Sequence, residues 1–437
     1  MKAIGLDIGT TTISAVVMEQ RTRFAVQTRT VANQSFLKTA RSWEKLQDAS
    51  VILKQAKELL DQLLDAADDI CVIGLTGQMH GIVYMDRNGA CISPLYTWED
   101  ERAEQKCFVG RSLCQLLKEQ YGVSAHTGYG LITHCFHTMT QSVPDGACRI
   151  CTIADYIGMQ LTGRKQPLVH ASNAASLGLY RTEAGCFDTQ TIASLHMDVS
   201  ILPAITEQFA LLGTYRGIPV CTAIGDNQAS FLGAVEDPAH TILVNMGTGG
   251  QISAFSPSFF DSEEVETRPL WPGGYLLVGS VLCGGRAYAL LKDFFAAYGR
   301  AMGVPEADHY EIMRRLLEKG RPTRERLVVD SRFAGTRQEP ARRGAVTNIG
   351  VDNFTPESLI YGVLDGIVEE VYQLYQKMKP GLQEEATKIV ASGNGLRKNE
   401  ALQRILAERF ALPVEVAAQE EEAACGAAIA GLTAVEA

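Results

Sequence analysis

Two stretches far apart in the chain repeat one pattern, and this repeat constrains the fold more than any other feature. Residues 3–17 read AIGLDIGTTTISAVV and residues 241–255 read TILVNMGTGGQISAF. Each is an apolar run, a polar residue, one apolar residue, Gly-Thr and a second apolar run, which is typical of a strand, a tight turn and a returning strand. The aligned pairs are Asp7 with Asn245, Gly9 with Gly247, and Thr10 with Thr248. The repeat predicts a tandem duplication of one structural unit.

Both copies begin a series in which strands alternate with helices, and this alternation predicts an α/β fold with layered domains. In the first half, a helical pattern around residues 46–66 leads to the strand ICVIGLTG. In the second half, helices are expected near residues 287–299, 356–378, 398–410 and 420–433. Proline and charge interrupt the pattern at VEDPAH, residues 235–240. We therefore predict two domains, residues 1–236 and residues 237–437.

Composition and charge limit the kinds of molecule that the protein is expected to bind. The 437 residues carry a formal net charge of −10, whereas nucleic acid and anionic membranes demand a basic surface, so neither is an expected partner. No apolar run approaches the roughly 20 residues that span a bilayer. Eleven cysteines are scattered, and MKAIGLDIGT begins a folded pattern at once, which predicts a cytoplasmic protein. The single CxxC, Cys148 and Cys151, lacks the second pair of a zinc site and is expected to hold core thiols.

The repeated turns suit phosphate binding. A tight strand-Gly-Thr-strand turn presents backbone N–H groups and a hydroxyl with no bulky side chain in the way. Either turn alone is as readily an ordinary hairpin, but two that face each other across a cleft would clamp a phosphate chain. Asp7 stands where a hydrated Mg²⁺ would sit beside such phosphates.

Three motifs together resemble the FGGY family of carbohydrate kinases, within the actin, Hsp70 and hexokinase superfamily. They are LDIGTT at residues 6–11, GDNQAS at residues 225–230 and ASGNGLRKNEALQ at residues 391–403. The resemblance spans the chain and implies two ribonuclease-H-like α/β domains around a central cleft, with ATP and Mg²⁺ as cofactors and a sugar as substrate. It implies that the first domain binds the sugar and carries the catalytic base, and that the second binds the nucleotide.

The resemblance also assigns nucleotide-binding positions. The first phosphate turn would be Asp7, Gly9, Thr10 and Thr11, the second Gly247, Thr248, Gly249 and Gly250, and the adenosine turn Gly393, Asn394 and Gly395. The residues fit the adenosine role independently, because SGNG follows a strand, precedes a helix and lets a ligand approach backbone.

Asp226 has two interpretations. A sugar hydroxyl must lose its proton as it attacks a phosphoryl group, and the family's matching aspartate is the base. Alternatively, Asp226 caps the helix that NQASFLGAV begins, since aspartate is a favoured N-cap. We predict the base, because capping does not explain the other motifs.

Polar residues for the sugar are expected at the end of the strand ICVIGLTG, where α/β sheets place ligands. Gln78 and His80 would bond hydroxyls, Met79 would form an apolar wall, and Trp98 would stack on the sugar. Asp100 suits a hydroxyl, while Arg102 suits either the ligand or an ion pair that holds the loop. Asn173 and Asn227 complete the predicted substrate set.

The motif GQMHG resembles xylulose and sedoheptulose kinases of the family, and NAAS at residues 173–176 resembles the sedoheptulose branch. Ala174, Ala175 and the glycines 284 and 285 would give room for the longer ketose. The expected reaction is phosphorylation of sedoheptulose at its terminal hydroxyl; xylulose or another ketose or polyol is the alternative. A nucleotide switch like actin or Hsp70, or a silent sugar sensor, is a remoter alternative, and a homodimer stays open.

Overall fold

The structure is a computed structural model that describes residues 1–304, 307–318, 326–336, 339 and 341–436. Its contacts divide the chain into two compact units. Unit 1 comprises Met1–Glu236, Arg268–Gly273 and Gln419–Ala437, and unit 2 comprises Asp237–Thr267 and Gly274–Ala418. Among the described residues, no helix is long and apolar enough to cross a membrane.

Unit 1 is built on a mixed sheet with the strand order β13-β14-β5-β1-β2-β3. The strands are β1 (Lys2–Ile8), β2 (Thr12–Glu19), β3 (Ala25–Ala32), β5 (Ile70–Gly77), β13 (Leu211–Tyr215) and β14 (Ile218–Gly225). β1 pairs with β2 antiparallel and with β5 parallel, and β5 pairs with β14 parallel. The carboxyl ends of β1, β5 and β14 therefore meet at one edge of the sheet.

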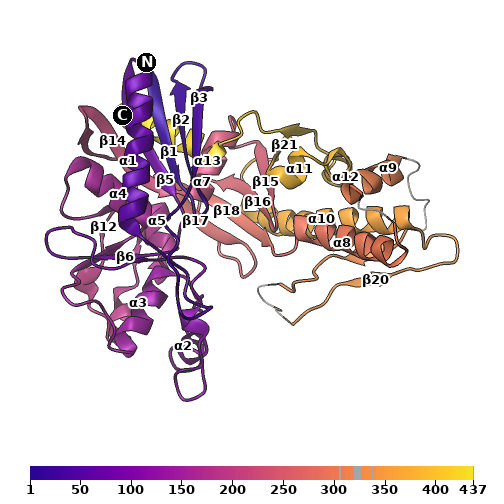
Figure 1. The fold of residues 1–437 in the computed structure, drawn as a ribbon, viewed down its shortest axis with the longest axis horizontal. Helices are drawn as coiled ribbons and strands as arrows, with labels where there is room; N and C mark the ends of the chain where they lie inside the picture. Colours follow the sequence, from indigo (N-terminus) through magenta and orange to yellow (C-terminus); the bar gives the residue numbers. More distant parts are fainter. Residues whose placement is uncertain (305–306, 319–325, 337–338, 340, 437) are drawn as a thin grey trace. The chain divides into compact units, whose positions relative to one another are not determined.

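Helices cover both faces of this sheet (Figure 1). Ile4, Leu6 and Ile8 of β1 lie in the core with α1 (Ala49–Ala66) and α4 (Ile153–Thr162). Ala3 and its same-face neighbours pack against α13 (Glu422–Glu436). Side chains alternate along a strand, so Asp7 shares the α13 face with Ala3. Asp7 is thus the last side chain of β1 on that face.

The last helix departs from the predicted division at residue 236. α13 packs on α7 (Asp226–Ala234), β5 and β1, all in unit 1. Its sequence is rich in alanine and glycine, and the approach is close: a Cβ at Gly5 would lie 1.8 Å from Ala424 O, and one at Gly74 1.7 Å from Ala427 O. This close backbone packing ties the end of the chain to the first strands.

Unit 2 repeats the sheet with the strand order β17-β18-β16-β15-β21-β22. The strands are β15 (Thr241–Met246), β16 (Gly250–Ser256), β17 (Glu266–Trp271), β18 (Gly274–Val281), β21 (Lys388–Ser392) and β22 (Val414–Val416). Of β17, the first two residues belong to unit 2 and Arg268–Trp271 to unit 1. β15 pairs with β16 antiparallel and with β21 parallel, as β1 does with β2 and β5. The predicted duplication therefore holds at the level of strand pairing.

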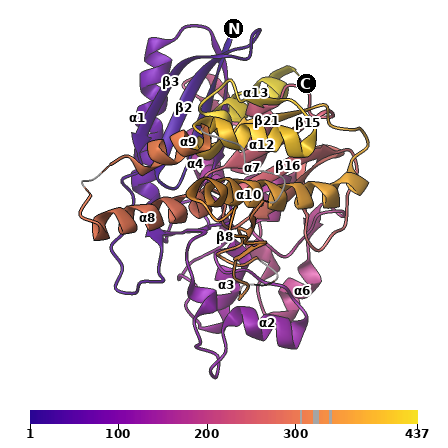
Figure 2. The same ribbon diagram turned by 90° about the vertical axis from the view of Figure 1, so that its right-hand side faces the viewer.

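Helix α10 (Pro356–Met378) packs on β16 and β18 of this sheet. Figure 2 shows α8 (Gly285–Ala301) and α12 (Glu400–Phe410) beside it, and α9 (His309–Glu318) also contacts it. α10 spans the predicted residues 356–378 because Thr355 caps Ser358 N and Pro356 fits the first turn.

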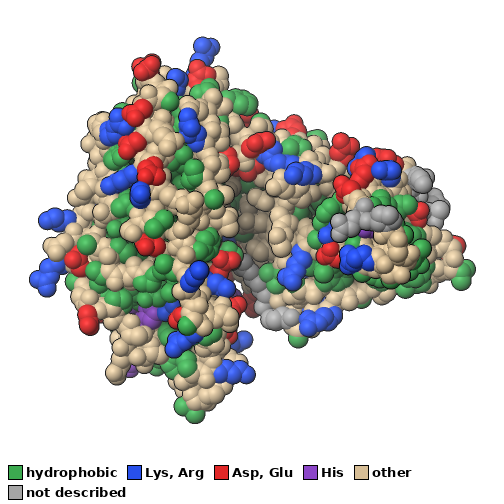
Figure 3. Space-filling model, viewed as in Figure 1, with side chains coloured by type: hydrophobic (Ala, Val, Ile, Leu, Met, Phe, Trp, Pro, Cys, Tyr) green, Lys and Arg blue, Asp and Glu red, His purple; other side chains and the backbone are tan. Residues whose placement is uncertain are grey.

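On the face of the molecule in Figure 3, basic and acidic side chains are interspersed.

The remaining helices and strands lie outside the two six-stranded sheets. In unit 1 they are β4 (Leu46–Gln47), β6 (Val83–Met85), β7 (Leu95–Tyr96), α2 (Leu113–Tyr121), α3 (Gly130–Met139), β8 (Arg149–Cys151), β9 (Leu168–His170), α5 (Ala171–Ser176), β10 (Tyr180–Arg181), β11 (Cys186–Phe187), α6 (Thr189–Ser194) and β12 (Ala204–Thr206), with turns of 3₁₀ helix at Arg102–Glu104 and Val199–Ile201. In unit 2 they are β19 (Val328–Asp330), β20 (Ala345–Thr347), the 3₁₀ turn Lys379–Gly381 and α11 (Asn394–Arg397).

Candidate functional site

The first Gly-Thr turn, Gly9–Thr11 between β1 and β2, is held by side chains from elsewhere in unit 1. Asn33 Nδ2 donates to Gly9 O at 3.0 Å, Gln47 Nε2 to Thr10 O at 2.8 Å, and Trp98 Nε1 to Thr10 Oγ1 at 3.0 Å. The Asn33 N–H also donates to Thr11 O. These bonds occupy the carbonyls of the turn.

Asp7 lies at the carboxyl end of β1, where its Oδ1 is buried without a hydrogen-bond partner among the described residues. Burial raises the pKa of Asp7 to about 7, and the charges of Asp226 and Glu421 raise it further. Two carboxylates that repel each other, one with an unpaired oxygen, form a site suited to a cation. Among the described residues, however, no cluster of three or more His, Cys, Asp or Glu side chains could hold a metal ion by itself.

Asp226 is the first residue of α7 and follows the carboxyl end of β14. Gly225 is the N-cap, and no side chain makes a capping hydrogen bond there. Burial raises the pKa of Asp226 to about 6, while Arg268 and the Asn227 backbone N–H lower it. The capping interpretation therefore has no support in the geometry, and the carboxylate is left for another role.

Three buried side chains fix the end of β14 that carries Asp226. Thr76 Oγ1 donates to Ile224 O at 2.8 Å, Ser172 Oγ accepts from Gly225 N at 2.9 Å, and Asn173 Nδ2 donates to Ala223 O at 3.2 Å. Each is less than 2% exposed. The backbone that positions the carboxylate is thus held from two sides.

The segment Gln78–His80 follows β5. Gln78 Nε2 donates to Gln47 Oε1 at 2.8 Å, and Thr10 Oγ1 lies 3.4 Å from Gln78 Oε1. Gln78 thus connects the end of β5 to the first turn. The Met79 thioether packs on Gly225, where a Cβ would lie 2.8 Å from its sulfur.

His80 adopts a φ of 72°, which non-glycine residues rarely do, and such strain is concentrated at functional sites. Its ring stacks on Tyr129 at 4.4 Å between centroids. Its Nδ1 lies 2.8 Å from Ser176 O, a pairing in which the nitrogen carries the proton. These contacts fix both the backbone and the ring of His80.

Asp100 and Arg102, predicted near the sugar, form an ion pair. Asp100 Oδ1 accepts from Arg102 Nε at 2.6 Å, Oδ2 accepts from Arg102 Nη2 at 3.0 Å, and Oδ2 also accepts from Lys45 N. Asp100 is fully buried, and Arg102 also contacts the ring of His137. The structure therefore favours the loop-holding interpretation of Arg102 and gives Asp100 the same role. Trp98 of this loop is 47% exposed and therefore accessible to a ligand.

Asn173 lies in a buried polar cluster instead of an open pocket. It is 1% exposed, and its amide lies 3.4 Å from Asp155 Oδ2. Burial raises the pKa of Asp155 to about 7, against hydrogen bonds from Thr152 and Asn173 that lower it. Ala174 is fully buried in the hydrophobic core. Asn173 thus supports β14 through Ala223 O, and the burial of Ala174 gives no support to the expectation that Ala174 and Ala175 leave room for a longer sugar.

The second turn, Gly247–Gly249 between β15 and β16, is held by backbone. Gly247 N donates to Gly249 O at 2.9 Å, Gly285 N to Gly247 O at 3.0 Å, and Arg286 N to Thr248 O at 3.0 Å. Gly250 opens β16. A Cβ at Gly284 would lie 2.8 Å from Gly249 O, and one at Gly285 2.3 Å from Gly247 O. The paired glycines therefore serve this turn, and the prediction that they enlarge a sugar pocket is corrected.

The predicted adenosine turn lies beside the second phosphate turn. Gly393 follows β21 with φ at 77°, and its Cβ would lie 2.6 Å from Met246 O. A Cβ at Gly395 would lie 2.7 Å from the same carbonyl, and Asn394 begins α11. Gly393 and Gly395 thus pack closely on β15, while Gly247, around which a Cβ would meet nothing within 4 Å, leaves a surface of glycine backbone that suits a ligand that must approach closely.

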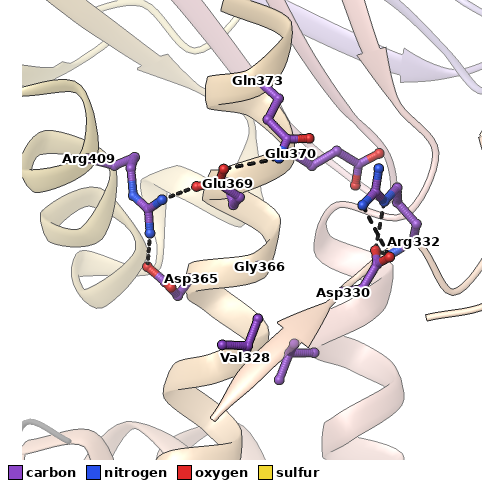
Figure 4. Close-up of a pocket in the computed structure, with 10 residues that line it drawn as sticks. Val328, Asp330, Arg332, Asp365, Gly366, Glu369, Glu370, Gln373 and Arg409 are labelled. Atoms are coloured by element: carbon purple, nitrogen blue, oxygen red, sulfur yellow. Dashed lines mark hydrogen bonds and ion pairs between the residues drawn. The ribbon is translucent and has the colours of Figure 1, made fainter. Parts of the chain in front are cut away.

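A pocket of about 430 Å³ lies elsewhere in unit 2, between β19, α10 and α12 (Figure 4). Arg409 contacts Glu369 and donates to Asp365 at 2.9 Å, while Arg332 donates to Asp330 at 2.7 Å. Glu370 Oε2 has no hydrogen-bond partner among the described residues. Because the other charged side chains that line the pocket form ion pairs with one another, we interpret it as a contact region between these elements and not as a ligand site.

Several residues of the site escaped the sequence analysis: Asn33, Gln47, Thr76, Tyr129, Ser172, Ser176 and Arg268. Most belong to no motif, and they reach the site only through pairing of distant segments. Ser172 immediately precedes NAAS, Ser176 is the last residue of that motif, and Thr76 immediately precedes GQMHG, so a place in or beside a motif was their one signal.

Comparisons with known proteins match one family over both halves of the chain. The N-terminal domain of the FGGY family of carbohydrate kinases matches residues 2–233, and the family's C-terminal domain matches residues 243–435. Sedoheptulokinases from Mus musculus and Homo sapiens are 25% and 26% identical to the chain, over 98% of it and 96% of their own lengths. Glycerol kinase from Rhodopseudomonas palustris is 25% identical over 99% of the chain and 89% of its own.

The fold matches solved structures. The xylulose kinase structure from Rhodospirillum rubrum superposes with a TM-score of 0.84 at 21% identity, over 98% of this chain and 89% of that one. The ligand-bound xylulose kinase from Lactobacillus acidophilus gives 0.82 at 18% identity, over 100% and 89%. At these identities the match establishes the α/β architecture of two tandem actin- and hexokinase-like domains.

Proposed function

This chain belongs to the FGGY family of carbohydrate kinases and is a sugar phosphotransferase, and we propose that it transfers the terminal phosphoryl group of ATP to the terminal hydroxyl of a ketose, with Asp226 as the general base. The observation that carries the proposal is the placement of Asp226. Its carboxylate stands at the carboxyl end of β14, caps no helix, and is held by a backbone that three buried side chains fix.

In the proposed step, the acceptor hydroxyl gives its proton to Asp226 while its oxygen attacks the γ-phosphorus. The bond to the β–γ bridging oxygen breaks, and ADP leaves with that electron pair. A pKa near 6 suits a base that is ionised at neutral pH yet accepts a proton in the transition state. The ionised form is favoured by Arg268 and the Asn227 N–H.

We assign the sugar to the neighbourhood of Gln78, Met79, His80, Trp98 and Asn227. His80 supports this assignment through its strained backbone and fixed ring, and Trp98 through its exposure beside the first turn. Asp100 and Asn173 are not assigned to the sugar. Asp100 forms an ion pair with Arg102, and Asn173 donates a hydrogen bond to Ala223 O of β14.

Mg²⁺ fits the Asp7 site, because Asp7 Oδ1 is buried and unpartnered among the described residues and lies near a second carboxylate. One or two carboxylates completed by water and phosphate oxygens are a usual Mg²⁺ environment. When bound, the ion would offset negative charge on the phosphates.

We assign the nucleotide to the second phosphate turn, Gly247–Gly250, and to Gly393–Gly395, with its phosphates also bound by the first phosphate turn, Gly9–Thr11. The support is the glycine backbone surface at the ends of β15 and β21. Backbone N–H groups that no side chain covers are a common phosphate cradle.

Sedoheptulose is the proposed ketose, and the reaction would yield sedoheptulose 7-phosphate. The support is the likeness to two sedoheptulokinases over nearly the full length of all three chains. Xylulose is the alternative, favoured by the xylulose kinase structures that share the fold.

A cytoplasmic setting suits the eleven cysteines, all within the described residues and all free thiols.

ADP release measured over a panel of ketoses, polyols and aldoses tests the substrate. We expect kcat/KM for sedoheptulose to exceed that for xylulose by at least about tenfold, because unpaired polar groups penalise a shorter substrate. Equal or better use of xylulose would overturn the sedoheptulose assignment, whereas no phosphorylation of any sugar would overturn the choice of acceptor class. Gel filtration of the same preparation would establish whether the enzyme is a homodimer.

A further inference from the structure

Arg268 lies outside every motif, 42 positions after Asp226, yet it contacts the residue next to the proposed base. Its Nη1 donates to Asn227 Oδ1, and Asn227 Nδ2 lies 3.3 Å from Asp226 Oδ1. The three side chains thus form a series from a guanidinium through an amide to a carboxylate. Arg268 comes from β17, while Asn227 and Asp226 open α7.

The chemistry of the Asn227 amide determines which of its ends faces Arg268 and which faces Asp226. A guanidinium has donors only, so it can meet only the oxygen end of the Asn227 amide. The NH₂ end is then turned toward Asp226, where it donates to the carboxylate. Without Arg268, the two ends of the amide could exchange, and the amide oxygen would face a carboxylate oxygen with no proton between them.

The guanidinium is held in place by more than its own contact. Gln228, the next residue of α7, is 1% exposed, and its Nε2 donates to Pro269 O at 3.0 Å. Pro269 and Leu270 are themselves buried in β17. Two adjacent hydrogen bonds, one from Arg268 and one to Pro269 O, therefore join the first turn of α7 to β17. The position of Arg268 is thus set by the backbone as well as by its side chain.

The charges around this series favour the same arrangement. Burial lowers the pKa of Arg268, and the nearby Tyr129 and Asp226 act to raise it. Asp7 of β1 is the second carboxylate that interacts with Asp226, and Glu421 acts on Asp7 in turn. Arg268 thus acts as a cation on Asp226, the carboxylate that also interacts with Asp7.

We propose that Arg268 is a positioning residue for the transfer step, which acts through Asn227 to hold the Asp226 carboxylate toward the acceptor hydroxyl. This inference rests on the proposed role of Asp226 as the base. It assigns to β17 a part in the chemistry that no motif of the chain indicates.

A double-mutant cycle in kcat tests the inference. We expect Arg268→Met to lower kcat about 10- to 100-fold, because a small displacement of a catalytic group costs up to about a hundredfold. Asn227→Ala should cost a similar factor, and the double variant should be no slower than the slower single variant, since both break one series. Arg268→Lys, which retains a donor, should recover kcat to within about tenfold of the parent.

Two controls distinguish a positioning role of Arg268 from a general effect of removing an arginine. In the Asp226→Asn background, Arg268→Met should lower kcat by less than threefold, because the base it positions is already gone. Arg216→Met, which removes a surface arginine paired with Asp61 and Asp65, should leave kcat unchanged. Thermal melting would show whether each variant is folded, and if Arg268→Met is not, Arg268→Ala, which also removes the donor, takes its place in the cycle.

Factors that multiply in the double variant would overturn the inference, since Arg268 would then act independently of Asn227. A further large loss in the Asp226→Asn background would overturn it as well. Either result leaves the proposed function standing if Asp226→Asn alone abolishes turnover. Full turnover by Asp226→Asn would instead contradict the proposed base itself.

Discussion

The two sheets share one frame but carry different groups on it. β1, β5 and β14 of unit 1 correspond in order and direction to β15, β21 and β22 of unit 2. At the strand ends, unit 1 places the side chains of Asp7, Gln78 and Asp226, whereas unit 2 places Gly247 and Gly393. One half of the duplication is therefore suited to proton transfer and the other to close approach by a ligand.

The Gly-Thr turns show the same difference in how they are held. Side chains of Asn33, Gln47 and Trp98 hold the first turn, while backbone bonds and Gly285 hold the second. The two turns should consequently be sensitive to different substitutions: the first to loss of a polar side chain, the second to gain of a Cβ.

Among substitutions in the turns, the largest effect is expected for Gly393→Ala in unit 2. Alanine at a φ of 77° is strained, and its Cβ would lie 2.6 Å from Met246 O, so the turn must shift. Strain and overpacking each cost about 1–2 kcal/mol, and the affinity for an ATP analogue should fall at least about 30-fold. Calorimetric titration measures this directly.

Gly163→Ala is the matched control, because Gly163 has a φ of 71° but open space around a Cβ. It carries the strain without the collision and lies in unit 1, at the end of α4. Its affinity for the analogue should stay within threefold of the parent. An equal loss in both variants would show that general destabilisation, not the glycine surface, sets nucleotide affinity.

A smaller effect is expected for Gln47→Ala in unit 1. The change leaves Thr10 O and Gln78 Nε2 without their bonds to Gln47, and each lost bond typically costs about 1 kcal/mol. We expect kcat/KM to fall about tenfold in the ADP-release assay. Gln55→Ala, which removes similar bonds to Ala32 O and Gln34 N in an exposed setting, is the control and should change it less than twofold.

The smallest effect concerns stability. The folded pKa of Asp155 is about 7, above its usual 3.8, so the folded protein retains a proton that the unfolded chain releases. The contribution of Asp155 to stability is therefore complete below about pH 4 and is lost as the pH rises toward 7. Asp155→Asn should flatten this decline by about 1–2 kcal/mol. Urea denaturation at pH 5 and pH 8 measures it, and an unchanged decline would exclude Asp155 as its source.

The sequence predicted what local patterns determine. The duplicated turns, α10 at residues 356–378 and the position of Asp226 directly after an apolar strand all rest on short stretches of the chain. It did not predict that α13 packs in unit 1, because the Gly and Ala contacts of Gly5 and Gly74 become visible only when distant segments pair. The burial of Asn173 and the approach of Arg268 to Asn227 escaped prediction for the same reason.

The central claim is that unit 1 supplies the chemistry through Asp226 while the glycine surface of unit 2 binds the nucleotide. Asp226→Asn, assayed for turnover by ADP release and for affinity to an ATP analogue by calorimetry, tests both parts at once. The amide keeps the shape and loses the basicity, so kcat should fall roughly 10²- to 10⁴-fold while the nucleotide affinity stays within threefold. Turnover within threefold of the parent would contradict the account.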